Sequence, residues 1–155
     1  MLCFKINNMR NLIYLIIIFA FTSCAEKKND YEIINTFFDE HKISVKNLSS
    51  EPFYLKEGLE YWKEKEFKDL NFEIIKNEKY KIDTSLVKNK YTDSKSIFCK
   101  TRISKPLFSK DRKRILLAVD ENCGSDKSLT IYLLKKDKGK YVYETDIKST
   151  RTYRH

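Results

Sequence analysis

The four cysteines carry most of the reactive chemistry that this sequence offers, and Cys24 has the most informative neighbours. Cys24 follows Thr22 and Ser23, two small residues at the end of the unbroken apolar run Leu12–Phe21. The residues before that run include basic side chains and no acid. A basic start, a short apolar stretch and small residues at a cleavage point predict a secretory signal peptide. We therefore expect residues 1–23 to be removed on export.

The segment Phe21-Thr22-Ser23-Cys24 resembles the lipobox of bacterial lipoproteins. The resemblance implies that the Cys24 thiol is diacylated (a palmitate-type anchor), that the chain is cut before it, and that the new amine is acylated. More than one acyl chain makes such an anchor durable. Two alternatives stay open: an ordinary secretory peptide with Cys24 as a leftover thiol, and a membrane anchor. The apolar run spans about half of the ~20 residues that a membrane-crossing helix requires, which disfavours the anchor.

The remaining cysteines fit an oxidising compartment. Cys3 leaves with the signal peptide, so Cys99 and Cys123 remain, and two cysteines are enough for one disulfide. A metal site is disfavoured because the chain has no CxxC pair and its only histidines are His41 and His155. A lone reactive thiol stays open as the weaker alternative. We interpret His41 as part of the charged end of a helix, where a histidine interacts well with the helix dipole.

No catalytic or cofactor-binding motif is visible in the sequence. The patterns GxSxG and HExxH and the phosphate-binding glycine loops are absent, and the glycines are Gly58, Gly124 and Gly139. Carboxylates are plentiful, but the sequence places no pair of them in a cleft. We therefore expect no catalytic residue, no cofactor, no metal and no enzyme activity.

Length and charge limit the partners. Removal of the first 23 of the 155 residues would leave 132, enough for one domain with its own core. The formal charge of +9 falls to about +7 because Lys5 and Arg10 leave with the signal peptide. Lys, Glu and Asp are interspersed, which is typical of a solvated surface. We expect no nucleic acid partner, whereas anionic lipid head groups would attract a tethered basic domain.

Helical patterns come first along the mature chain. Asn29 and Glu32 form a capping-box pattern that predicts a helix over Asp30–His41, with one apolar face: Tyr31, Ile33, Ile34, Phe37 and Phe38. A second helix is predicted over Lys56–Leu70, with one side formed by Leu59, Trp62, Phe67 and Leu70. We interpret the single tryptophan as a core residue. Short strands are predicted around Tyr80–Ile82.

Strand patterns follow. Four strands are predicted, at Ser96–Ile103, Arg114–Asp120, Leu129–Lys135 and Tyr141–Ile147, with a turn at Asp137-Lys138-Gly139. They predict an antiparallel β-meander with the N-terminal helices packed on its apolar face, which is an α+β fold. The predicted organisation is a signal peptide (1–23), a lipidated tether (24–30), a single α+β domain (31–149) and a basic tail (150–155).

The first two strands also predict a cysteine pairing. If they form a hairpin with its tip in Ser109–Lys113, the residue opposite Cys99 falls at about 121–123, a window that contains Cys123. Neighbouring strands lie about 4.8 Å apart, which suits the Cα separation of a disulfide. Such a bridge would stabilise the fold by roughly 3.5 kcal/mol in the chain-entropy model. We expect Cys99→Ser to lower the melting temperature and to abolish a gel shift under non-reducing conditions.

The C-terminal half resembles an uncharacterised group of small bacterial exported lipoproteins. The resemblance covers about half of the mature chain and includes YLKEGLEYWKEKEF and the positions Ser104, Pro106, Phe108, Ser109, Asp111, Cys123, Gly124, Gly139, Lys140 and Tyr141. It implies a helix before an α+β sheet domain and carries no activity. The group often has a second Cys-Gly shortly after the first, where this chain has Ser125-Asp126-Lys127, so its disulfide pattern can differ.

The leading functional interpretation is a membrane-anchored exported lipoprotein that acts as a non-catalytic binding module in the cell envelope. The run of acids that directs surface display in some lineages is not matched after Cys24, which favours the periplasmic side of the outer membrane over the cell surface. The expected partners are the membrane, through the lipid, and an envelope protein or peptidoglycan. A periplasmic inhibitor or immunity-type lipoprotein is the alternative, followed by an enzyme.

Overall fold

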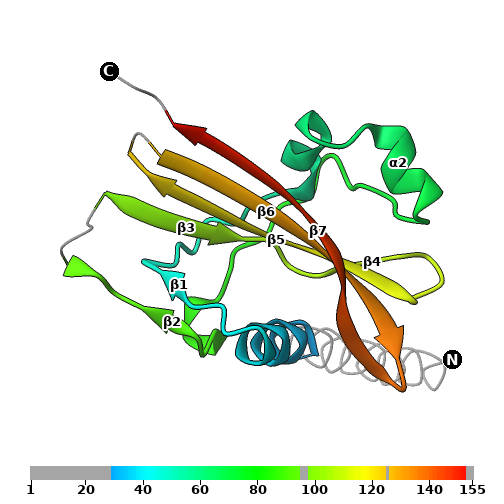
Figure 1. The fold of residues 1–155 in the computed structure, drawn as a ribbon, viewed down its shortest axis with the longest axis horizontal. Helices are drawn as coiled ribbons and strands as arrows, with labels where there is room; N and C mark the ends of the chain where they lie inside the picture. Colours follow the sequence, from blue (N-terminus) through cyan, green and yellow to red (C-terminus); the bar gives the residue numbers. More distant parts are fainter. Residues whose placement is uncertain (1–28, 95–97, 125, 153–155) are drawn as a thin grey trace, which may run out of the picture.

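The computed structural model describes residues 29–94, 98–124 and 126–152, which form a mixed α+β arrangement (Figure 1). Residues 29–40 are helical and are called the N-terminal helix below. The other described elements are, in order, β1 (Val45–Lys46), η1 (Leu55–Glu60), α2 (Glu64–Asp69), η2 (Thr84–Leu86), β2 (Lys90–Tyr91), β3 (Cys99–Ile103), β4 (Leu107–Phe108), β5 (Arg114–Cys123), β6 (Asp126–Asp137) and β7 (Lys140–Thr152).

The main sheet has five strands in the order β3-β5-β6-β7, with β4 also paired to β5, and every pairing is antiparallel. The four strands predicted from the sequence are present as β3, β5, β6 and β7. The last three extend beyond their predicted bounds because strand pairing, and not only the apolar pattern, sets their length. β7 continues to Thr152, three residues into the segment that the sequence predicts to be a tail.

Two turns set the register of the sheet. Lys138 and Gly139 both have positive φ (45° and 86°), as a two-residue turn between twisted antiparallel strands requires. At the predicted hairpin tip, the carboxylate of Asp111 accepts hydrogen bonds from Ser109 Oγ at 2.7 Å and from the backbone N–H of Lys113 at 3.1 Å. These hydrogen bonds lower the pKa of Asp111 from its ordinary value.

β3 and β4 lie end to end along the same edge of β5, and Ser104 joins them. Pro106 cannot donate a ladder hydrogen bond, which explains why the edge strand is interrupted here. The backbone N–H of Ser104 donates to the carbonyl of Ala118 at 3.0 Å, and Ser104 Oγ accepts from the N–H of Ala118 at 2.9 Å. The fully buried hydroxyl therefore replaces a backbone acceptor at the break.

The continuous helix predicted over Lys56–Leu70 is wrong: the structure has the 3-10 helix η1 and the short helix α2 instead. Gly58 accounts for part of the difference, since a Cβ at this position would lie 2.8 Å from Ile131 Cδ1 on the sheet. The backbone of η1 therefore lies directly on the sheet at Gly58, where a residue with a side chain would not fit. α2 then begins anew, with the Glu66 carboxylate accepting from the N–H of Lys63 at 3.0 Å.

The buried residues form two clusters on opposite faces of the sheet, because successive strand residues point to opposite sides. One cluster joins residues of the N-terminal helix to the odd-numbered residues of β5: Tyr31, Ile34, Phe37, Phe38, Ile115, Leu117 and Val119. The other joins η1 and α2 to the even-numbered ones: Leu55, Phe67, Leu116 and Ala118. Figure 1 shows the strands of the sheet passing between the N-terminal helix and α2.

Trp62 is partly buried against the second cluster, as a core residue, with its ring 4.9 Å from that of Phe67. No strand forms at Tyr80–Ile82 within the described residues, although the sequence predicts short strands there. The chain instead forms a second, parallel pair from β1 and β2. Two-residue strands of this kind have no alternating pattern that a sequence could reveal.

Candidate functional site

The structure brings two of the predicted site residues together. Cys99 and Cys123 are direct partners in the β3–β5 register, and their sulfur atoms lie at disulfide distance, 2.20 Å apart. Their position agrees with the register predicted from the hairpin tip. Cys24, the predicted lipidation site, lies outside the described residues, as does the predicted signal peptide.

A groove on the surface is the candidate site among the described residues. It has a volume of about 430 Å³ and runs between the N-terminal helix, the segment 75–82 and β4. Its walls are mainly apolar, with Tyr31, Ile34, Ile82, Leu107 and Phe108 among them. Volumes of this size are typical of sites that bind small molecules or single side chains of a partner. The exposed fraction of Ile75 at its margin is 56%.

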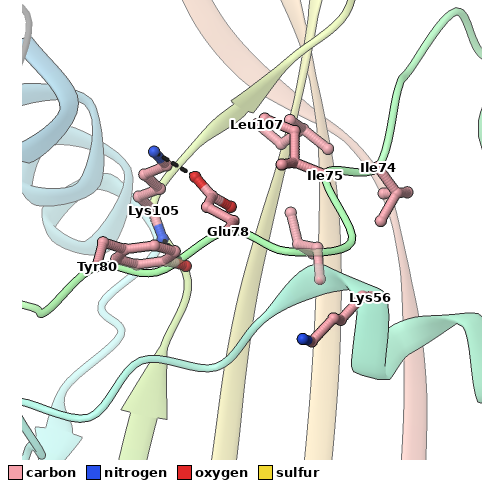
Figure 2. Close-up of a pocket in the computed structure, with 8 residues that line it drawn as sticks. Lys56, Ile74, Ile75, Glu78, Tyr80, Lys105 and Leu107 are labelled. Carbon is pink, nitrogen blue, oxygen red and sulfur yellow. Dashed lines mark hydrogen bonds and ion pairs between the residues drawn. The ribbon is translucent and has the colours of Figure 1, made fainter.

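A second, more enclosed pocket borders the groove and is far smaller, with a volume of about 10 Å³ (Figure 2); the two share the lining residues Ile75, Glu78, Tyr80, Lys105 and Leu107. It is lined by Lys56, Ile74 and Glu78 among others. A space of this size admits about one water molecule. This small pocket therefore has no room for a substrate, whereas the open groove beside it has room for a ligand.

An ion pair provides the polar group of this pocket, where Glu78 and Lys105 face each other (Figure 2). The Oε1 atom of Glu78 is shielded from solvent and forms no hydrogen bond of regular geometry with the described residues, so the ion pair alone balances it. The ammonium of Lys105 also lies 4.9 Å from the centre of the Tyr80 ring. Lys105 is thus held by a carboxylate and by an aromatic face.

Tyr80 has a positioning role in this site. Its hydroxyl donates to the carbonyl of Phe53 at 3.1 Å and accepts from the backbone N–H of Lys105 at 3.2 Å. Burial raises the pKa of the Tyr80 phenol above its ordinary value. The phenol therefore stays protonated at physiological pH and acts as a structural bridge between the segments that form the groove.

His41 lies apart from the groove, directly after the N-terminal helix. Its backbone N–H donates to the carbonyl of Phe37 at 3.1 Å, and its exposed ring lies 4.6 Å from that of Phe37 and 5.6 Å from that of Tyr143. This agrees with its interpretation as the end of a helix. Within residues 29–94, 98–124 and 126–152, no group of three or more His, Cys, Asp or Glu residues is arranged to hold a metal ion.

Sequence reasoning missed the groove. Its walls come from three segments that are distant in the sequence, and neither Glu78 nor Lys105 belongs to a motif. The described helices include none that is long and apolar enough to cross a bilayer. Comparison of the chain with family models, with curated proteins and with solved structures finds no match.

Proposed function

We propose that this chain is an exported lipoprotein, anchored through Cys24 on the periplasmic side of the outer membrane, and that its folded part is a non-catalytic binding module of the cell envelope. The cysteine pattern carries the proposal. Cys24 follows an apolar export segment, and the other two cysteines of the mature chain lie at disulfide distance. Disulfides persist in the periplasm and are rare in the cytosol, so both features favour the same compartment.

The groove supports binding, since it is open and mainly apolar and its charged residues Glu78 and Lys105 are paired with each other. The partner that we propose is an envelope protein that presents an apolar side chain flanked by carboxylates. Ile75 offers an exposed apolar contact. Among the charged residues that line the groove and the pocket beside it, Lys105 and Glu78 form an ion pair. The charges of Lys56, Lys81 and Asp30 remain, so the net charge of the rim is positive. A basic rim of this kind attracts an acidic partner and sets its orientation.

The placement is tested on the full chain, expressed in a bacterium and labelled with palmitate. We expect label in the wild type and none in Cys24→Ala, which should also leave the membrane fraction. In the same samples, the wild type should migrate faster without reductant than with it, and Cys99→Ser should not shift. An unlabelled wild-type chain, or Cys24→Ala that fractionates as the wild type does, would overturn the lipid anchor. Free thiols at both Cys99 and Cys123 in periplasmic material would overturn the disulfide and remove its support for an oxidising compartment.

The partner is tested with a photo-crosslinking residue placed at Ile75 in intact envelopes. We expect a crosslinked protein product that resists muramidase and that weakens when Lys56 and Lys81 are both changed to Glu. The matched control carries the same residue at the exposed Lys127, at the end of β6 opposite to the end that lies level with β4, and should give no such product. A product that muramidase digests would show peptidoglycan as the partner instead. Equal products at both positions, or none at Ile75, would refute the groove as the contact.

A further inference from the structure

The outer edge of β7 is the longest free strand edge in the described structure. β7 has 13 residues and is the last strand of the sheet, where its backbone pairs with β6 alone among the described residues. Its one register shift lies opposite Leu133 and Leu134, near the turn. From Thr145 onward the pairing is regular. Edge strands of this length present a row of unpaired backbone groups and act as templates for another strand.

The hydrogen bonds of β6 show which backbone groups of β7 face outward. The N–H of Lys136 donates to the carbonyl of Lys113, on the β5 side. Because backbone groups alternate along a strand, even-numbered residues of β6 bond to β5 and odd-numbered ones bond to β7. Their partners in β7 are Thr145, Ile147 and Ser149. The N–H and C=O groups of the residues between these partners therefore point away from the sheet.

The outward-facing residues in the regular part are Asp146 and Lys148, and their charges select a register. A second copy that pairs antiparallel with this edge is related to the first by a two-fold axis. An axis at Asp146 would place two carboxylates opposite each other, and an axis at Lys148 would place two ammonium groups opposite each other. An axis at Ile147 places each Asp146 opposite Lys148 of the second copy. Like charges directly opposite destabilise a strand pair and unlike charges stabilise it, so the third register is favoured.

We propose that this chain forms a two-fold dimer through antiparallel pairing of β7 with β7 of a second copy, centred on Ile147. The two five-stranded sheets then form one continuous sheet. Within each copy, Lys148 Nζ already lies 3.5 Å from Asp146 Oδ2. In the dimer these four side chains form one alternating network across the axis. Ile147 of one copy lies opposite Ile147 of the other. The two form a pair without backbone hydrogen bonds between them, where side chains approach most closely.

Cysteine crosslinking of the full chain tests the register. Cα atoms of such a pair lie about 4.5 Å apart, within the range that a disulfide spans. We expect Ile147→Cys to give a dimer band on a non-reducing gel that disappears with reductant. Thr145→Cys is the matched control on the same side of the strand, because it faces Ser149 of the second copy and its own counterpart lies roughly 13 Å away. Absence of the Ile147→Cys dimer, or an equal yield from Thr145→Cys, would refute this register.

Charge exchange tests the contact without a covalent bond. By light scattering in detergent, the wild type should show a concentration-dependent dimer, and Lys148→Glu should weaken its association roughly tenfold or more. The double variant Asp146→Lys with Lys148→Asp restores unlike charges across the axis and should recover the dimer. A variant that merely perturbed folding would not be rescued in this way. A wild type that stays monomeric at every concentration, or a double variant that stays as weak as the single one, would overturn the proposal.

Discussion

The two edges of the sheet differ in how they end. At the β3 edge, the chain between β1 and η1 covers the strand: the N–H of Ser49 donates to Thr101 O at 2.8 Å, and the N–H of Phe53 donates to Ile103 O at 3.0 Å. Beyond β4, the N–H of Lys110 donates to Asn71 O at 2.8 Å. At the opposite edge, β7 has no such cover within the described residues.

The two edges differ in how much their side chains contribute to the stability of the folded monomer. At the covered edge, Thr101 and Ile103 of β3 are buried and contribute to the core. The side chains of residues 140–149 in β7 are half-buried or exposed and contribute less to the folded monomer. Proteins normally protect their edge strands. Charged side chains and a bulge limit unspecific pairing at β7, and the charges of Asp146 and Lys148 favour the one register proposed above.

The largest expected effect comes from a matched pair of substitutions, one at each edge. Ile103→Ala should lower the free energy of unfolding by about 2–5 kcal/mol, since it leaves a cavity under the covering segment. Ile147→Ala should lower it by about 1 kcal/mol, because the half-buried side chain loses less apolar contact. Urea unfolding at low protein concentration measures both. Equal losses at the two edges would show that β7 is covered as tightly as β3.

Much of the sheet could be predicted from the sequence because its information is local. The short apolar runs at residues 114–120 and 129–135 and the turn at Asp137-Lys138-Gly139 predict three strands and their order, which the structure contains. The same reasoning placed Cys123 opposite Cys99. The break within Lys56–Leu70 could not be predicted, since it depends on how closely Gly58 approaches Ile131, which lies 73 positions later in the chain.

The candidate site was less predictable for the same reason. The groove depends on Tyr80, whose hydroxyl joins Phe53 to Lys105 across three separate segments. A lone tyrosine between lysines in a sequence has no signature of such a bridge. The charged residues of β7 are visible in the sequence. Which of them have backbone groups that face away from the sheet depends on the register of β7 with β6, and the sequence does not give that register.

A middle-sized effect is expected at the break between β3 and β4. Ser104→Ala removes the acceptor of the Ala118 N–H in a fully buried position, which leaves that donor unpaired. We expect a loss of about 1–3 kcal/mol in the free energy of unfolding. The control at the open edge is Ser149→Ala in β7, for which we expect a change within about 0.5 kcal/mol. If Ser104→Ala unfolds like its control, the hydroxyl does not hold the two edge strands together.

The smallest effect concerns the ion pair that fastens the covering segment to β3. Lys100 Nζ lies 2.9 Å from Glu51 Oε2, and this hydrogen bond and charge lower the pKa of Glu51 below its ordinary value of 4.5. A carboxylate whose pKa is lowered on folding stabilises the fold at pH values above its unfolded pKa, and this contribution disappears as the pH falls through its folded pKa. Glu51→Gln should therefore lower the melting temperature slightly at neutral pH, by about a degree, since exposed pairs contribute little.

The difference in melting temperature between Glu51→Gln and the wild type should vanish in acid and in the Lys100→Gln background. A difference that persists in that background would mean that Glu51 stabilises the covered edge through some contact other than Lys100.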